Sequence, residues 1–161
     1  KIHQKILALR NQGSIVKYQH IMKGGNHRLD TIQAIVLKEK MPYIEEWNQA
    51  RRDVVKVYEQ KIVNKKVLLP KTHQNVLPVH HVYPVLVENR EKFCAFLDAK
   101  KIQWGVHYPQ CIEEMKMYKD LSNPSEKSIE YTKKMVSLPI HPFMKSEEVR
   151  YICEALNNYE E

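Results

Sequence analysis

The stretch VHHVYPVLV, residues 79–87, carries the clearest strand pattern in this chain of 161 residues. Its β-branched and aromatic side chains favour extended backbone, and Pro84, which lacks an amide hydrogen, places the strand at a sheet edge or at a bulge. IQWGVHY, residues 102–108, is expected to form a second strand. The residues between them, 90–101, are expected to form a helix whose inward face carries Phe93, Phe96 and Leu97.

Further elements are expected on both sides of this strand–helix–strand segment. Short strands are predicted near residue 67 and over residues 136–138, and a helix start is predicted at Asn123-Pro124. A final helix over residues 146–159 places four apolar side chains inward, namely Val149, Ile152, Cys153 and Leu156. The fold class is therefore predicted as α+β, with a small, mostly antiparallel sheet covered by helices.

The residues before the sheet are predicted to be mainly helical. A helix over residues 1–12 is expected to stop near Gly13, and Asp30 with Gln33 matches a capping box at the start of another. That helix has an apolar face formed by Ile32, Ile35, Val36 and Leu37. After Pro42 a further helix carries apolar residues at helical spacing, namely Trp47, Ala50, Val54, Val57, Tyr58 and Ile62.

The composition limits the classes of partner. The net charge is +7, and residues 1–72 hold 15 basic and 6 acidic side chains. A basic half can bind an anionic ligand, although a solvated helical surface explains the same charge. Nucleic acid is not an expected partner, because the aromatic residues fall mainly on predicted core faces and are not interleaved with the basic ones.

The cysteines and the apolar runs bear on location. The cysteines are three in number and form no CxxC pair, which favours a reducing cytoplasm over a disulfide framework. Two of them, Cys94 and Cys153, are expected to be core residues. No apolar run is long enough for a membrane span, and the first residues resemble an amphipathic helix more than a signal peptide.

The glycine pair in MKGGNHRLDTIQ, residues 22–33, marks a loop that differs from the familiar phosphate-binding motifs. It matches neither GxxxxGK[ST] nor GxGxxG, and Asp30 puts a carboxylate at the helix start, where an anion would otherwise bind. Upstream of that helix, Asn26 offers amide donors and Arg28 a guanidinium group. These suit a phosphate presented by another surface, and the alternative is a turn with a structural arginine.

The histidines give no metal site. His80 and His81 are adjacent on the predicted strand and would face opposite sides, and Pro109 argues against a helix joining His107 to Cys111. The pair His107-Tyr108, at a strand end, is a better candidate for binding, with a partly buried, hydrogen-bonded histidine as the alternative. No catalytic nucleophile is predicted.

Five stretches, in order and in register along the chain, resemble the DegT/DnrJ/StrS sugar aminotransferases, which are pyridoxal-phosphate enzymes of fold type I. The G-x-N-x-R motif leading into QAA is matched by GGNHR, residues 24–28, and IQAI. The RR…Y motif is matched by Arg51, Arg52 and Tyr58, and H-x-Y with a later arginine is matched by His81, Tyr83 and Arg90. GI-x-x-x-HYP is matched by KIQWGVHYP, residues 101–109. LP-x-HP is matched within SLPIHPFMKSEEV, residues 137–149.

The resemblance implies an activity and a site. Such enzymes move an amino group from glutamate, through pyridoxal 5'-phosphate, to the keto group of a nucleotide-linked sugar, and they work as homodimers with sites at the subunit interface. Asn26, with Arg28, is implied to reach the cofactor phosphate of the partner subunit. His107 and Tyr108, with His81, are implied to border the sugar nucleotide.

The resemblance also implies a division of the chain. Residues 1–63 would be a helical segment that belongs to, or links from, a large domain, with residues 22–29 as a dimer-facing loop. Residues 64–161 would be the C-terminal α+β small domain. The Schiff-base lysine and the acid that pairs with the pyridine nitrogen lie upstream of G-x-N-x-R in the family, so no catalytic residue is expected in this chain.

The chain departs from the family pattern after the HYP segment. The family often continues HYP-x-P-x-H, whereas Cys111 and Glu113 occupy the proline and histidine positions here. Glu113 puts a negative charge where histidine could carry a positive one, beside an anionic substrate. This exchange is expected to affect the specificity for the sugar or the nucleotide. Two interpretations remain: a C-terminal portion of an aminotransferase, or a naturally short non-catalytic module that binds a nucleotide sugar or pairs with a full-length subunit.

Overall fold

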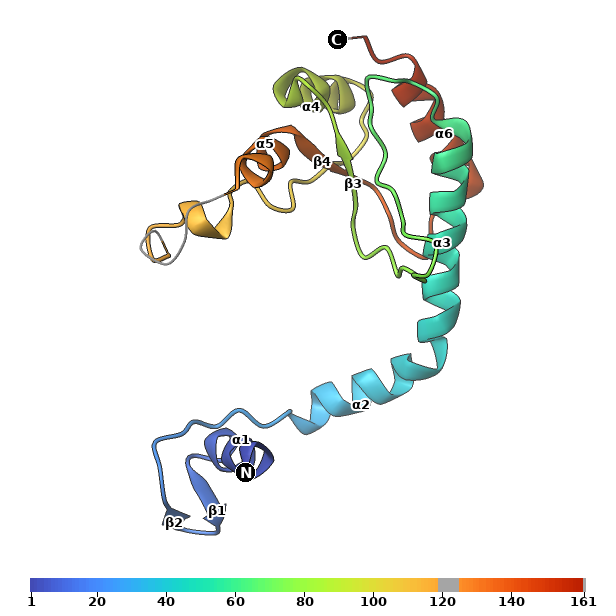
Figure 1. Ribbon diagram of the computed structural model, residues 1–161. Coiled ribbons are helices and arrows are strands. Elements are labelled where there is room, and N and C mark those ends of the chain that lie inside the picture. The colour runs from blue at the N-terminus through green and yellow to red at the C-terminus, as the bar shows by residue number, and fades with distance from the viewer. Residues whose placement is uncertain (119–124, 161) are drawn as a thin grey trace. The chain divides into compact units, whose positions relative to one another are not determined.

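The computed structural model describes residues 1–118 and 125–160 and divides into two compact units, Lys1–Ile44 and Glu45–Glu161 (Figure 1). This division differs from the predicted boundary between residues 63 and 64. The reason is helix α3, Ile44–Lys61, which supplies Val54, Val55 and Tyr58 to the core of the second unit.

The first unit contains two helices, one 3-10 turn and a short antiparallel hairpin. They are α1 (Ile2–Arg10), β1 (Ser14–Val16), β2 (Gln19–His20), α2 (Thr31–Lys40) and η1 (Met41–Tyr43). Helix α1 ends two residues earlier than predicted, and Gly13, at a φ of +77°, donates its N–H to the Ala8 carbonyl at 2.7 Å. The positive φ explains why glycine stands where the chain turns away from the helix.

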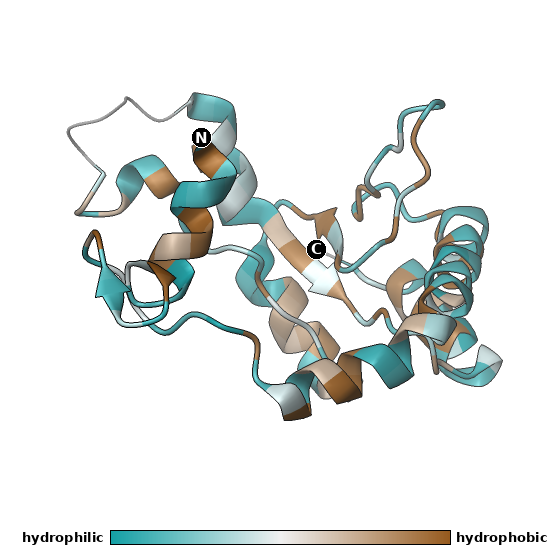
Figure 2. Cartoon of the chain, turned by 90° about the horizontal axis from the view of Figure 1, so that it is seen from below, coloured by the Kyte–Doolittle hydropathy of each residue, from teal (hydrophilic) through white to brown (hydrophobic). Residues whose placement is uncertain are grey.

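The first unit buries little. Within residues 1–44 the buried residues are Ala8, Gly13 and Ser14. Helix α2 begins after Asp30 as predicted, but the side chain of Asp30 makes no capping hydrogen bond. The predicted apolar face of α2 is exposed, since Ile32 is 74% exposed and Ile35 55% exposed. The hydropathy colours in Figure 2 show apolar positions along the helices of the chain.

The second unit is built on an antiparallel pair of strands, β3 (Tyr83–Leu86) and β4 (Met135–Leu138). Tyr83 pairs with Leu138 and Leu86 with Met135, and single bridges at Leu68 and Gly105 extend the pair on its two sides. The other elements of this unit are α3, α4 (Arg90–Ala99), η2 (Ile112–Glu114), α5 (Glu126–Lys134) and α6 (Ser146–Asn157). The predicted α+β class, with a small antiparallel sheet, is therefore confirmed.

The strand predicted over residues 79–87 is shorter in the structure. His80 has a φ of +47° and residues 81–82 bend, so β3 starts only at Tyr83. Pro84 is tolerated inside β3 because Leu86, two residues on, directs its N–H and C=O toward Leu68. The backbone of Pro84 faces the same side as that of Leu86. The bridge on that side joins Leu68 to Leu86 alone, so no partner strand lies opposite Pro84 to require an N–H.

The strands predicted near residue 67 and over residues 102–108 are reduced to single bridges. Leu68 pairs with Leu86, and Gly105 pairs with Ser137. Trp104, beside Gly105, donates its indole N–H to Asp98 at 2.8 Å instead of extending a strand. The helix start predicted at Asn123-Pro124 lies outside the described residues, and α5 has Ser125 as its N-cap.

The core lies among the strand pair, α3, α4 and α6. Figure 1 shows α3 beside α6, and Asn157 of α6 donates to the Lys61 carbonyl at the end of α3 at 2.7 Å. Phe93 and Leu97 of α4 are fully buried, while the predicted inward residue Phe96 is only partly buried. The four inward residues predicted for α6 are all buried, as are Cys94 and Cys153.

Candidate functional site

The loop over residues 22–29 is held along the end of α1 by backbone hydrogen bonds. Gly25 donates to the Leu9 carbonyl at 3.0 Å and accepts from Gln12 at 2.8 Å, and His27 donates to the Arg10 carbonyl at 2.9 Å. Each bond joins the loop to residues 9–12, so the loop backbone in front of Asn26 has a defined course.

Gly13 and Gly24 are required where these two backbone segments cross. A Cβ on Gly13 would lie 1.7 Å from the Met22 carbonyl oxygen, and a Cβ on Gly24 would lie 2.3 Å from the Gly13 nitrogen. Neither distance is compatible with a side chain. Gly24 therefore serves a contact between backbones, which the sequence pattern alone does not distinguish from an approach to a ligand.

Asn26 and Arg28 are brought together on the surface of this loop. Arg28 Nε donates to Asn26 Oδ1 at 3.1 Å, and both side chains are exposed. Because that bond uses the amide oxygen, the two Nδ2 hydrogens of Asn26 and the terminal nitrogens of Arg28 are left as donors. Such donors suit phosphate oxygens.

His107 and Tyr108 also lie together, at the edge of the second unit's sheet. His107 Nδ1 lies 3.0 Å from Ser137 Oγ, and its ring meets that of Tyr108 edge to face at a centroid distance of 5.7 Å. Tyr108 is 72% exposed. The predicted strand-end pair is thus accessible on one side and anchored to β4 on the other.

His81 is not brought to this pair by any described contact. It is exposed in the bend before β3, and no hydrogen bond or ring contact of the described residues joins it to His107. Its neighbour His80 is half-buried against Tyr83, with ring centroids 6.0 Å apart. Burial lowers the pKa of His80 below its ordinary value of 6.5, and nearby Glu59 partly opposes this shift.

Several motif residues have structural contacts. Tyr58 donates its hydroxyl to the Pro139 carbonyl at 2.8 Å, and its ring packs against Tyr83 at 5.4 Å. Burial raises the pKa of both tyrosines far above the ordinary value of 10.0, so both hydroxyls stay protonated. Arg90 donates to the Thr132 carbonyl at 2.5 Å, which ties the start of α4 to α5.

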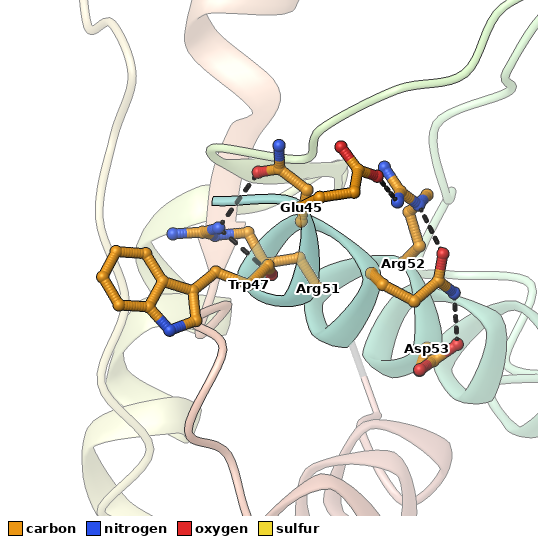
Figure 3. A network of polar contacts seen from close by, with 7 residues as sticks. Glu45, Trp47, Arg51, Arg52 and Asp53 are labelled. Atoms are coloured by element: carbon orange, nitrogen blue, oxygen red, sulfur yellow. Dashed lines mark hydrogen bonds and ion pairs between the residues drawn. The ribbon is translucent and has the colours of Figure 1, made fainter. Parts of the chain in front are cut away.

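The two arginines of the RR…Y motif are engaged along their own helix (Figure 3). Arg52 pairs with Glu45 at 2.5 Å and donates to Gln49 at 3.0 Å, and Arg51 donates to the Trp47 carbonyl at 3.2 Å. The Arg52 side chain is only 13% exposed. These contacts order the start of α3.

The two departures from the family pattern both lie at one 3-10 turn, η2. Cys111 is buried at the N-cap of η2, with its sulfur 3.8 Å from Thr132 Oγ1, and Glu113 is half-buried within η2. Cys111 is thus part of the packing between η2 and α5.

Ser137 is the residue that sequence reasoning missed. It is 4% exposed on β4 and contacts His107 from thirty residues away. A single serine before Leu-Pro carries no signal of its own, and only the bridge between Gly105 and Ser137 shows the connection.

Within residues 1–118 and 125–160, no three His, Cys, Asp or Glu side chains cluster as metal ligands would. No described helix is both long and apolar enough to cross a membrane.

Comparison with known proteins places this geometry in a family. The chain is 36% identical over 160 residues to dTDP-3-amino-3,6-dideoxy-alpha-D-galactopyranose transaminase of Aneurinibacillus thermoaerophilus, covering 99% of this chain and 44% of that protein. It is 28% identical to dTDP-3-amino-3,4,6-trideoxy-alpha-D-glucose transaminase of Streptomyces venezuelae, again over 44% of the relative. The chain thus spans less than half the length of these curated relatives.

Solved structures agree. S. venezuelae DesV, in complex with a ketimine intermediate, matches 97% of this chain and 43% of its own, with a TM-score of 0.89 and 29% identity. A DegT DnrJ EryC1 StrS aminotransferase from Brucella abortus matches 94% of this chain and 42% of its own, at a TM-score of 0.83 and 25% identity. These neighbours are fold type I sugar aminotransferases, so the predicted fold is confirmed. The family model for the DegT/DnrJ/EryC1/StrS aminotransferases matches residues 1–157, and the chain belongs to that family.

Proposed function

We propose that this chain is the C-terminal portion of a pyridoxal-phosphate-dependent aminotransferase. The full-length protein would transfer an amino group from glutamate to the keto group of a nucleotide-linked sugar. The observation that carries the proposal is the match of 97% of the chain, at a TM-score of 0.89, to a structure that contains a ketimine intermediate. The Aneurinibacillus and Streptomyces relatives are both named as dTDP-sugar transaminases, which supports the substrate class.

The donors in the loop over residues 22–29 fit the phosphate of that cofactor. Asn26 Nδ2 and the Arg28 guanidinium group would hold phosphate oxygens, and the Arg28–Asn26 bond of 3.1 Å keeps the two donors together. When bound, pyridoxal phosphate supplies the reactive carbonyl and the electron sink for amino transfer. The catalytic lysine and most of the cofactor site would belong to a large domain outside this chain.

The exposed pair His107-Tyr108 would bind and orient the nucleotide-linked sugar, and His81 would contribute from the bend before β3. An imidazole N–H and a phenolic hydroxyl can both donate to phosphate or sugar oxygens. Glu113, half-buried on η2, would add negative charge where the family often has histidine, and would thereby bias the choice of sugar or nucleotide.

The full-length protein is proposed to be a cytoplasmic homodimer in which the loop over residues 22–29 faces the partner subunit. Three free, buried cysteines agree with a reducing compartment. The exposed donors of Asn26 and Arg28 agree with a phosphate that is presented by another surface.

The experiment is an assay of 2-oxoglutarate release by the full-length protein that contains this chain. We expect release from glutamate beyond one equivalent per cofactor only when a dTDP-, UDP- or GDP-linked keto sugar is present to take up the amino group. No such sustained release with any of these sugars, or sustained release that does not depend on the sugar, would contradict the proposal.

A variant tests the cofactor role of the loop. Asn26→Ala in the full-length protein should raise the dissociation constant for pyridoxal phosphate roughly 10-fold, because it removes hydrogen bonds to a charged group. Lys23→Ala, a charge removed from the same loop, is the control and should change this constant by much less. If the two variants weaken the cofactor equally, Asn26 does not bind its phosphate directly.

A further inference from the structure

A buried hydroxyl lies directly behind His107. Ser137 is 4% exposed on β4, and its Oγ is 3.0 Å from His107 Nδ1. The backbone of Ser137 is already paired, since its N–H donates to Gly105 at 2.7 Å and its C=O accepts from Gly105 at 3.2 Å. The hydroxyl is therefore the polar group of Ser137 that can form a hydrogen bond with the imidazole ring.

The direction of this hydrogen bond follows from the burial of Ser137. A buried hydroxyl proton needs an acceptor, and Nδ1 of His107 is the partner that the described part of the chain supplies. If the ring carried its proton on Nδ1, the hydroxyl proton would be left without an acceptor. The serine therefore donates to Nδ1, and the proton of the neutral ring is on Nε2.

Two further contacts restrict the orientation of the His107 ring. A Cβ on Gly105 would lie 2.8 Å from His107 Cε1, so glycine leaves the space that the imidazole occupies. The Tyr108 ring meets the imidazole at an interplanar angle of 82°. The ring is thus held by a hydrogen bond at Nδ1, by the absence of a side chain at residue 105, and by an aromatic edge.

We propose that Ser137 is a positioning residue that fixes His107 as an Nε2–H donor for an oxygen atom of the nucleotide-linked sugar. This inference rests on the proposed function and adds to it the protonation state and orientation of one substrate-binding group. Phosphate and sugar oxygens are hydrogen-bond acceptors, so an imidazole locked as an Nε2–H donor favours them, whereas the other tautomer would present a lone pair to them.

The tautomer is measured directly, and without turnover, in the full-length protein labelled with ¹⁵N in its histidine rings. The resonances of His107 are identified by their loss in His107→Gln. We expect wild-type His107 to show a single Nε2–H tautomer with Nδ1 as acceptor. Ser137→Ala and Gly105→Ala, which disturb the ring from different sides, should both give shifts averaged between tautomers or ring positions. Ser137→Thr, which keeps the hydroxyl, should restore the wild-type shifts.

A matched control separates positioning from stability. Val136→Ala removes methyl groups from the neighbouring, fully buried position of β4 and leaves the hydroxyl of Ser137 in place. It should lower the melting temperature and leave the His107 tautomer unchanged. A wild-type His107 protonated on Nδ1 would overturn the inference, as would a tautomer that Ser137→Ala leaves unaltered.

Kinetics link the tautomer to the substrate. Ser137→Ala should raise KM for the nucleotide-linked sugar about 3- to 10-fold, with kcat and KM for glutamate nearly unchanged, because one hydrogen bond is weakened. Ser137→Thr should recover the sugar KM, and Val136→Ala should not change it. An active protein whose sugar KM is unaffected by Ser137→Ala refutes this inference alone. A protein that aminates no nucleotide sugar refutes the proposed function, while the tautomer remains readable.

Discussion

At the scale of single residues, the glycine pair shows what a sequence pattern can and cannot specify. The pattern predicted a loop at residues 22–29, and the structure has one. The approach at Gly24 is to Gly13 and not to a ligand, because residues 22–27 lie along the end of α1. No spacing rule connects residue 13 with residue 24, so the sequence could not identify what the glycine approaches.

Gly13→Ala should therefore displace the loop that carries Asn26. The substitution combines a φ of +77° with a Cβ placed 1.7 Å from the Met22 carbonyl oxygen, and should cost about 1–3 kcal/mol or more. Hydrogen exchange checks this, since the amides of Gly25 and His27 should lose protection. Gly25→Ala is the control, because the atoms nearest to its Cβ would belong to the movable ring of His27. Equal protection of these amides in both variants would show that the close contact between the backbones at Gly13 and Gly24 does not hold the loop in place.

His80 should make stability depend on pH. Burial lowers its pKa in the folded state below 6.5, so below that pH the unfolded chain binds the proton first. The free energy of unfolding should therefore fall as pH drops below about 6.5 toward the folded-state pKa. His80→Asn, which tolerates the φ of +47°, should flatten this slope, and His81→Asn should leave it in place. Denaturant titrations between pH 5 and 8 measure this slope. If the free energy of unfolding of His80→Asn depends on pH as in the wild type, His80 is not the group responsible.

At the scale of elements, helices were predicted better than strands. The apolar period identified the buried face of α6, because a helix satisfies its own backbone and needs a partner only for one stripe. For α3 it correctly gave Val54 and Tyr58, but it also included Val57, which is exposed, and it left out the buried Val55. The lengths of the strands at Leu68 and Gly105 were overestimated, because a strand extends only as far as it pairs with β3 or β4, which come from elsewhere in the chain. The left-handed turn at His80, which shortens β3, also has no signature in a β-branched stretch.

Two asparagines join the ends of α3 and α6. Asn157 donates to the Lys61 carbonyl at 2.7 Å and accepts from the amides of Val63 and Asn64 at 2.8 and 3.3 Å. Asn64 in turn donates to the carbonyls of Leu156 and Tyr159 at 2.8 and 2.9 Å. Each side chain thus satisfies backbone groups at the end of the other segment.

Asn157→Ala should lower the free energy of unfolding by about 1–3 kcal/mol, because it removes three hydrogen bonds between two elements. Asn158→Ala is the matched control, since its side chain donates to the Glu154 carbonyl of the helix that it caps, at 2.9 Å. Urea denaturation measures both. Similar losses in the two variants would mean that the connection between the helix ends contributes little.

At the scale of the whole molecule, the first unit is covered with apolar side chains that it does not bury. Ile2 is 77% exposed, Tyr18 80% and Ile32 74%, while the second unit has a continuous core. Large exposed apolar surfaces mark interaction sites. This asymmetry agrees with the expectation that residues 1–63 belong to, or link from, a large domain. The chain spans 44% of the length of its Aneurinibacillus relative.

The candidate site could be predicted only in part at this scale. Asn26 with Arg28, and His107 with Tyr108, are neighbours in sequence, so their proximity followed from the sequence itself. Ser137 reaches His107 across the sheet and could not be predicted, and the cofactor and sugar roles came from family resemblance and not from spacing.

The most direct test follows the nitrogen atom. The full-length protein is incubated with pyridoxal phosphate, ¹⁵N-glutamate and nucleotide-linked keto sugars, and the sugar products are analysed by mass spectrometry and NMR. We expect a nucleotide-linked amino sugar that carries ¹⁵N on the former keto carbon. Glutamate turnover that leaves every sugar free of ¹⁵N would contradict this expectation.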